Sequence, residues 1–157
     1  MRRVIAAIAV VALGGGLMAG CGSSTKATSP AGGVTVGSTV GGTAVSVTAG
    51  DKSDTEQFLT VEPASVKAGN VTFTFKNTGT RQHEMIVLKT DDAVDQLKVD
   101  AATNKVSEDA SVGEVSETDA GKTVVKSLDL AAGKYVLVCN IEKHYAQGMR
   151  SSFTVTA

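Results

Sequence analysis

The chain has few aromatic residues and few of the residues that bind metals or form disulfides. Its 157 residues include no tryptophan, four phenylalanines, two tyrosines, two histidines and two cysteines. The formal net charge is −1, so nothing in the composition points to nucleic acid as a partner. Seventeen glycines against two prolines indicate many turns or a flexible segment. The length is enough for one domain of ordinary size.

The N-terminus lacks an apolar run long enough to span a bilayer comfortably, because Val4–Leu13 is too short. Arg2 and Arg3 precede this run, and LMAGC (17–21) follows it. A basic start, a short apolar stretch and small residues before a cut are typical of a secretory signal. The cysteine after those small residues resembles a bacterial lipobox, which implies cleavage before Cys21 and a lipid on its thiol. A plain signal peptide cut nearby is the alternative.

We therefore predict three parts: a lipoprotein signal peptide (1–20), a flexible tether (21–53) and a folded domain (54–157). Gly, Ser, Thr and Ala dominate the second part, which cannot bury enough apolar surface to offset its ordering entropy. Such a tether would span roughly 30 Å. Its segment TAVSVTA (43–49) alternates and is expected, at most, to pair as a weak edge strand. The lipid would place the domain outside the cytoplasm, anchored to the membrane.

The domain shows short alternating strands separated by turn signals. In VTFTFKN (71–77), Val71, Phe73 and Phe75 share one face. KYVLVCN (134–140) is apolar on both faces, as a central sandwich strand would be. Further strands are expected at 57–63, 83–89, 122–130 and 151–157. The pattern predicts an all-β Greek-key sandwich of about seven or eight strands.

A long polar insertion separates two of these strands, between Thr90 and Gly121. Its first part, DDAVDQLKV, is expected to form one or two helical turns capped by Asp91 or Asp92. The remainder is acidic and is interpreted as a solvated surface loop. A docking surface for a basic partner is the alternative, and the sequence does not decide between them.

Four residues could carry chemistry. Cys139 ends an apolar strand, His144 and Met149 follow it, and His83 opens an earlier strand. If Cys21 carries a lipid, Cys139 has no partner for an internal disulfide, and a lone thiol outside the cytoplasm is open to oxidation unless it is buried or ligated. Singly, each residue has an ordinary structural explanation. Together they use both histidines and the spare cysteine in one pattern.

This set of ligands favours copper. Thiolate and thioether suit Cu(I), imidazoles suit both oxidation states, and two His with one Cys and a weak axial Met form the blue-copper arrangement. Structural zinc would need better ligands than a thioether. A catalytic pair of Cys139 and His144 would leave His83 and Met149 without roles, and no oxyanion-hole motif follows the cysteine.

His83 followed by Cys139-x4-His144-x4-Met149 resembles the cupredoxin family, with the spacing of the rusticyanin and auracyanin type. The segment VEPASVKAGNVTFTFKNTGTRQHEMIVLK also resembles small bacterial cupredoxins. The likeness covers residues 56–157. It implies one copper ion, with the two histidines and Cys139 as equatorial ligands and Met149 as the axial ligand. One departure is Glu84, where many cupredoxins have the asparagine that joins the two ligand loops.

The resemblance implies a membrane-tethered electron carrier rather than an enzyme, expected to be monomeric. Its partners would be redox proteins such as a cytochrome or a membrane oxidoreductase. Two alternatives stay open: a copper-binding or delivery protein that uses the same ligands, and a metal-free sandwich that acts as a binding module. A multicopper enzyme would need a second, histidine-rich site, and both histidines are already used.

Overall fold

The computed structural model describes residues 42–157, and the predicted signal peptide, Cys21 and the tether up to residue 41 lie outside it. Among the described residues, no helix is long and apolar enough to cross a membrane. The strands are β1 (Thr43–Asp51), β2 (Gln57–Glu62), β3 (Ser65–Lys67), β4 (Gly69–Asn77), β5 (His83–Lys89), β6 (Ser111–Thr118), β7 (Thr123–Leu130), β8 (Gly133–Val138) and β9 (Arg150–Thr156).

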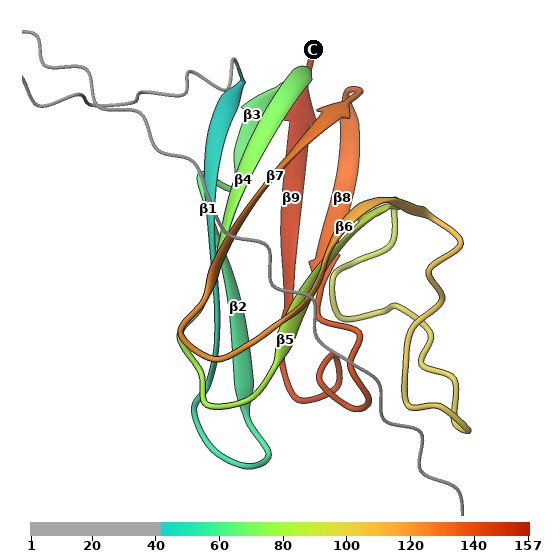
Figure 1. The fold of residues 1–157 in the computed structure, drawn as a ribbon. Coiled ribbons are helices and arrows are strands. Elements are labelled where there is room, and N and C mark those ends of the chain that lie inside the picture. Colours follow the sequence, from blue (N-terminus) through green and yellow to red (C-terminus); the bar gives the residue numbers. More distant parts are fainter. Residues whose placement is uncertain (1–41) are drawn as a thin grey trace, which may run out of the picture. The chain divides into compact units, whose positions relative to one another are not determined.

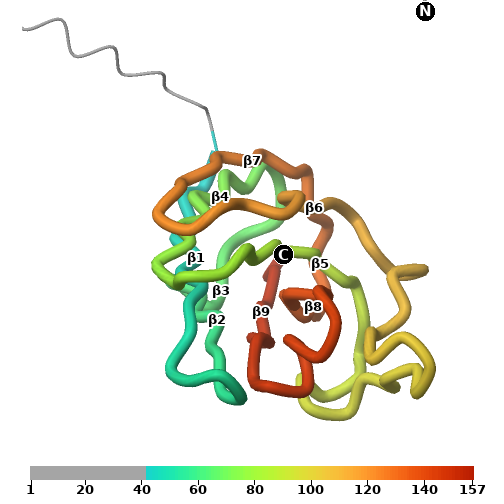
Figure 2. The backbone as a smooth tube through the Cα atoms, turned by 60° about the horizontal axis from the view of Figure 1, so that its bottom comes forward, coloured from blue at the N-terminus to red at the C-terminus, as the bar shows by residue number. Residues whose placement is uncertain are grey.

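The strands form two sheets that face each other. One has the order β2-β1-β4-β7 and the other the order β3-β9-β8-β5-β6. Figure 1 shows the two layers from the side, and Figure 2, turned toward the lower end, separates β1 and β2 from β5 and β8. Most neighbours are antiparallel, but β1 pairs with β4, and β3 with β9, in parallel. The all-β sandwich predicted from the sequence is confirmed.

The core lies between the sheets, and the alternation of the sequence accounts for it. Val71, Phe73 and Phe75 of β4 are fully buried, and Phe73 meets Phe153 of β9 edge to face, with ring centroids 5.6 Å apart. The predicted inward face of β4 is therefore confirmed. Packing between two inner faces is what holds an aligned sandwich together.

Strands β5 and β8 are buried on both faces, as the unbroken apolar character of β8 predicted. Tyr135, Leu137 and Cys139 face the main core. Val136 and Val138 face a second, smaller cluster, which is covered by apolar residues of the 90–110 segment: Val94, Leu97, Val99 and Val106. The long insertion therefore supplies the cover for the outer face of this sheet.

The predicted boundary of the folded domain is wrong, because residues 43–51 belong to it. Strand β1 is an internal strand rather than a weak edge strand, since it pairs with β2 on one side and with β4 on the other. Val45, Val47 and Ala49 are at most 1% exposed. The small residues of this segment suggested a tether. A strand that is paired on both sides satisfies its backbone N–H and C=O groups through its neighbours, so one face of small apolar residues is enough to bury it.

The predicted helical turns in the insertion are also wrong. Residues 91–99 form no helix and only one isolated hydrogen-bonded turn, in which the Gln96 N–H donates to the carbonyl of Ala93 at 2.9 Å. A helix of one or two turns is not stable alone, and the segment instead packs Val94, Leu97 and Val99 against the second apolar cluster, with a bridge between Val99 and Val106. The acidic remainder, interpreted as a loop, contains strand β6, which pairs with β5 through two register shifts.

Candidate metal centre

The predicted ligands come from two segments at one end of the sandwich. His83 is the first residue of β5. Cys139 directly follows β8, Met149 directly precedes β9, and His144 lies in the loop between them. Because β8 pairs with β5, the end of one strand lies beside the start of the other. The topology therefore brings residues more than fifty positions apart to one place.

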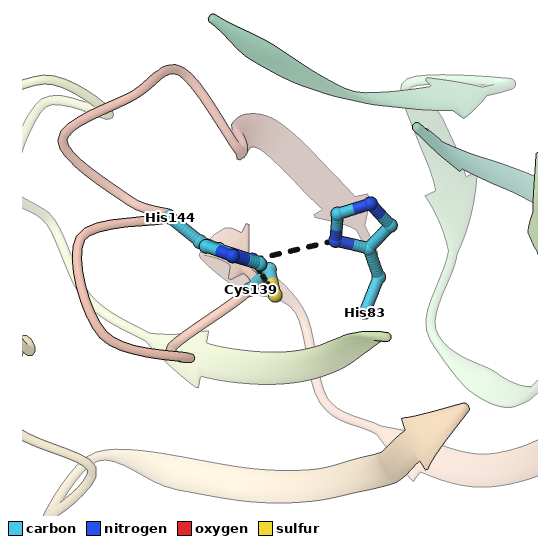
Figure 3. Close-up of side chains that lie close together, drawn as sticks. All are labelled: His83, Cys139 and His144. Atoms are coloured by element: carbon cyan, nitrogen blue, oxygen red, sulfur yellow. Dashed lines mark hydrogen bonds between the residues drawn. The ribbon is translucent and has the colours of Figure 1, made fainter. Parts of the chain in front are cut away.

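Three donor atoms converge in a buried cluster, which Figure 3 shows from close by. The Nδ1 atoms of His83 and His144 are 3.3 Å apart, and Cys139 Sγ lies 3.3 Å from His144 Nδ1. One ligand atom from each residue lies within 4.8 Å of the other two. The side chains of His83 and Cys139 are 0% exposed and His144 is 7% exposed. The three residues thus present two imidazole nitrogens and one sulfur to a common point.

Met149 lies in the main core and is fully buried. Its backbone is joined to both neighbouring ligands: its N–H donates to the carbonyl of His144 at 3.0 Å, and its carbonyl accepts from the N–H of Cys139 at 3.1 Å. These bonds close the ligand loop between β8 and β9. The assignment of the Met149 thioether as the fourth ligand stays a prediction.

Gly148 allows this loop to close against β2. Its φ is +111°, a conformation that residues with a side chain rarely adopt. A Cβ at this position would lie 2.7 Å from the carbonyl oxygen of Gln57. The side chains of Gln57 and Gln147 also meet, with a 2.9 Å bond from Nε2 to Oε1. A glycine at position 148 therefore suits both the backbone conformation and the close approach of β2.

The site favours uncharged ligands before any metal binds. Burial, followed by the nearby His83, lowers the pKa of His144 to about 4, so its ring is neutral near pH 7. Burial also raises the pKa of the Cys139 thiol to about 11. Metal binding must therefore displace the thiol proton, as thiolate ligation generally does.

Most of the folded domain matches a known domain family. The model of the sulfocyanin (SoxE) domain matches residues 57–157. The chain belongs to this family. Comparison with curated proteins found no match. The match begins at β2, so it leaves out β1, which the structure nevertheless places inside the sandwich.

Solved structures with the same fold include auracyanins and rusticyanins. Reduced auracyanin from Roseiflexus castenholzii is 22% identical, with 74% of this chain and all of that chain covered and a TM-score of 0.52. Rusticyanin from Thiobacillus ferrooxidans is 22% identical, with coverage of 73% and 79% and a TM-score of 0.54. Auracyanin A from Chloroflexus aurantiacus, titled a "blue" copper protein, is 23% identical, with coverage of 72% and 99% and a TM-score of 0.50. These likenesses establish the cupredoxin fold.

The donor set of this sulfocyanin-family chain fits copper. Cupredoxins bind one copper ion, and two imidazoles with a thiolate are the equatorial ligands of such a site. The three buried donors match that set in type, number and closeness. His83, Cys139 and His144 are therefore candidate ligands, and the backbone of Met149 is hydrogen-bonded to those of Cys139 and His144.

Two residues near the site were not assigned a role by the sequence. Asp51 of β1 contacts the His83 ring, with Oδ1 3.0 Å from Nε2. Glu84 accepts a bond from the Asn140 N–H at 3.0 Å, while its own N–H donates to Cys139 Sγ at 3.4 Å. Burial, more than the nearby Glu108, raises the pKa of Glu84. Glu84 thus joins the two ligand segments, the part that the family resemblance gives to an asparagine in many cupredoxins.

A sequence signal for Asp51 did exist. Val45, Val47 and Ala49 alternate toward the core, and continuing the same period of two places Asp51 on the inward side. An acidic residue on an inward face calls for a partner. The signal was lost because this segment was assigned to the tether.

Proposed function

We propose that this protein is an electron carrier held at the outer face of the cytoplasmic membrane, in which one bound copper ion supplies the change between Cu(I) and Cu(II). The observation that supports the proposal most is the convergence of three buried donor atoms within 4.8 Å of one another. Membership in the sulfocyanin domain family and the cupredoxin fold agree with it.

The surroundings of the donors favour electron transfer over exchange of the metal. Hydrogen bonds hold two of the donors and the loop that carries the third: Asp51 bonds the His83 ring, the N–H of Glu84 bonds the Cys139 sulfur, and the carbonyl of Ile141 bonds the backbone of His144. Ligands that cannot move far rearrange little when the oxidation state changes. A small rearrangement gives a small barrier to gaining or losing an electron, which suits a carrier.

The route for the electron is expected to pass through His144. Its 7% exposure makes it the donor nearest the surface, whereas His83, Cys139 and Met149 are fully enclosed. Ala146 beside it is exposed. The neighbouring Tyr145 is turned inward, and its hydroxyl donates to the carbonyl of Val94 and accepts from the N–H of Leu97. The proposed contact surface therefore consists of the His144 edge and Ala146.

The visible spectrum tests the copper site directly. Adding Cu(II) to the purified protein should produce an intense blue band from charge transfer between thiolate and copper. Cys139→Ser should abolish the band, and Cys21→Ser, which removes the other thiol, should leave it unchanged. A wild-type protein that stays colourless with copper would contradict the proposal and favour a metal-free binding module.

Electron transfer is separated from copper delivery by two mixing experiments. The reduced, copper-loaded protein is mixed with an oxidised cytochrome, and separately with a copper-free acceptor protein. A carrier reduces the cytochrome and keeps its copper. Loss of the metal to the acceptor, without reduction of the cytochrome, would indicate a delivery protein.

The membrane anchor is part of the same proposal and is supported by the sequence of residues 1–21. A tethered carrier searches for its partners in two dimensions, which raises their effective concentration. In a bacterial host, the wild-type protein should partition with membranes and take up labelled fatty acid. Cys21→Ser should lose both properties, while Ser23→Ala should keep them. Fatty acid on the Cys21→Ser variant would exclude Cys21 as the anchor.

A further inference from the structure

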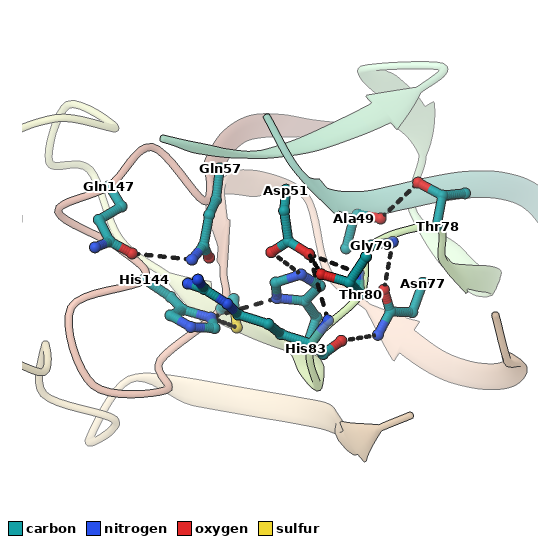
Figure 4. A network of polar contacts seen from close by, with 12 residues as sticks. Ala49, Asp51, Gln57, Asn77, Thr78, Gly79, Thr80, His83, His144 and Gln147 are labelled. Carbon is teal, nitrogen blue, oxygen red and sulfur yellow. Dashed lines mark hydrogen bonds and ion pairs between the residues drawn. The ribbon is translucent and has the colours of Figure 1, made fainter. Parts of the chain in front are cut away.

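Asp51 lies behind the ring of His83, on the side away from the other ligands. Its Oδ1 is 3.0 Å from His83 Nε2, whereas Nδ1 of the same ring faces His144 at 3.3 Å. The His83 side chain is 0% exposed and that of Asp51 only 11%. Figure 4 shows the ring held between the carboxylate on one side and His144 on the other.

The carboxylate is itself fixed by the loop that leads into β5. Its second oxygen, Oδ2, accepts from the backbone N–H of Thr80 at 2.6 Å, the Thr80 hydroxyl at 3.1 Å and the N–H of Arg81 at 3.3 Å. Three donors on one oxygen suit an ionised carboxylate. Burial alone would raise the pKa of Asp51, but the bonds from Thr80, the nearby His83 and the Arg81 N–H together lower it. Asp51 therefore contacts the loop through Oδ2 and His83 through Oδ1.

The loop is shaped to bring these groups together. The Gly79 N–H donates to Asn77 Oδ1 at 2.9 Å, and Asn77 Nδ2 donates to the carbonyl of Arg81 at 2.7 Å. Gly79 packs so closely that a Cβ there would lie 2.6 Å from Asp51 Oδ2 and 2.9 Å from His83 Nε2. Two segments thus build the contact between carboxylate and imidazole: β1, and the loop that leads into β5.

A carboxylate at Nε2 decides which nitrogen of a neutral imidazole carries the proton. A carboxylate can only accept, so the proton sits on Nε2 and the lone pair on Nδ1. That lone pair points toward His144 and Cys139. In metal proteins, a carboxylate behind a histidine ligand fixes the tautomer and ring orientation and strengthens the nitrogen as a donor.

We propose that Asp51 is a positioning residue of the copper site: it holds His83 in the Nε2–H form, with Nδ1 ready to bind, and its negative charge favours Cu(II) over Cu(I). This inference rests on the proposed function. It extends the site to β1, a strand that precedes the segment matched by the family model.

Asp51→Asn is the sharpest test, because asparagine has one oxygen where aspartate has two. Three donors from Thr80 and Arg81 compete for that oxygen, which leaves the NH₂ group facing His83 Nε2. His83 should then carry its proton on Nδ1, the nitrogen that is proposed to bind copper. Asp54→Asn is the matched control, since it makes the same change of charge at a nearby side chain that is 94% exposed and contacts Arg81 rather than His83.

Two measurements follow on wild type, Asp51→Asn and Asp54→Asn. Nitrogen NMR of the metal-free proteins should report the Nε2–H form of His83 in wild type and Asp54→Asn, and the Nδ1–H form in Asp51→Asn. Cu(II) affinity should fall about 10- to 100-fold in Asp51→Asn. The affinity for Cu(I) should fall less than the affinity for Cu(II). A tenfold fall in the ratio of Cu(II) affinity to Cu(I) affinity would raise the reduction potential by about 59 mV.

Outcomes for the two proposals differ. Suppose that the wild-type protein is blue, that His83 in Asp51→Asn keeps the Nε2–H form, and that this variant has the same reduction potential as Asp54→Asn. That result would overturn the role of Asp51 and leave the proposed function standing. A colourless wild type would overturn both. Circular dichroism checks that each variant is folded, and Asp51→Ser, which removes the charge with a smaller side chain, gives a second test: it should also raise the potential.

Discussion

At the scale of single residues, burial keeps the Cys139 side chain in its unreactive thiol form when no metal is bound. It is 0% exposed, a free thiol at the end of β8, and burial is the largest cause of its raised pKa. The thiolate is both the nucleophile and the metal ligand. Without metal, the thiol should therefore be protected from oxidation.

This protection can be measured with a thiol reagent on the metal-free Cys21→Ser protein, in which Cys139 is the only cysteine. A pKa of about 11 in place of 9.0 means that the thiolate fraction at pH 8 is about 100-fold lower than that of an ordinary cysteine. Reaction should be slower by at least that factor than in urea. Equal rates in the folded and unfolded protein would contradict the buried position of Cys139.

At the scale of elements, the ligand loop depends on Gly148. Alanine there must adopt a φ of +111° and also push its Cβ against the carbonyl of Gln57. Gly69 is a matched control, because its φ is +127° but nothing lies within 4 Å of an added Cβ.

We therefore expect Gly69→Ala to cost only the backbone strain, about 1 kcal/mol, and Gly148→Ala to cost roughly 2–4 kcal/mol because overpacking is added. Urea unfolding measures both costs. The blue band should be weakened or shifted in Gly148→Ala and unchanged in Gly69→Ala. Equal costs in the two variants would show that β2 does not restrain the loop.

Strand β1 is the second element on which the site depends. It buries Val45 and Val47 and carries Asp51. Burying two valines contributes about 3–6 kcal/mol, which is comparable to the whole stability of a typical domain, about 5–15 kcal/mol. Removing the strand also exposes the edges of β2 and β4, with which it pairs.

A chain that starts at residue 54 should therefore fail to fold, whereas one that starts at Gly42 should fold and bind copper. Dispersed NMR spectra and a cooperative unfolding transition distinguish the two. Folding of the shorter chain with an unchanged transition midpoint would mean that β1 is dispensable. The site could then not rely on Asp51.

At the scale of the whole molecule, copper binding and folding should be coupled. A ligand that binds only the folded state stabilises it by about 2.7 kcal/mol when its free concentration is 100 times the dissociation constant. For a domain of this size that corresponds to a rise in Tm of roughly 10 °C. Hydrogen bonds already hold the segments that carry the donors, so the far-ultraviolet circular dichroism should be the same with and without copper.

Removing the metal with a chelator should reverse the rise in Tm without loss of β structure. Cys139→Ser is the control, since it keeps the fold but lacks the thiolate, and copper should raise its Tm much less. A metal-free protein that loses its β signal would indicate that copper is needed to assemble the sandwich, contrary to the preformed site.

The sequence by itself determined the sandwich and the candidate ligands. Alternation in β4, the doubly apolar β8 and the spacing of Cys139, His144 and Met149 are local patterns, and a local pattern can be read without knowing the fold. The lipid site at Cys21 is also a sequence prediction, and it lies outside the described residues.

Only the tertiary structure decided what surrounds the ligands. Strand β6 has little apolar alternation and forms because it can pair with the edge of β5. The sequence of β1 is typical of a linker, and this segment becomes a strand because it pairs with β2 and β4. Asp51 and Glu84 acquire roles through contacts with His83 and Asn140, 32 and 56 positions away. Such contacts depend on strand order and register, which short-range periodicity does not encode, so they become visible only when the two sheets are assembled.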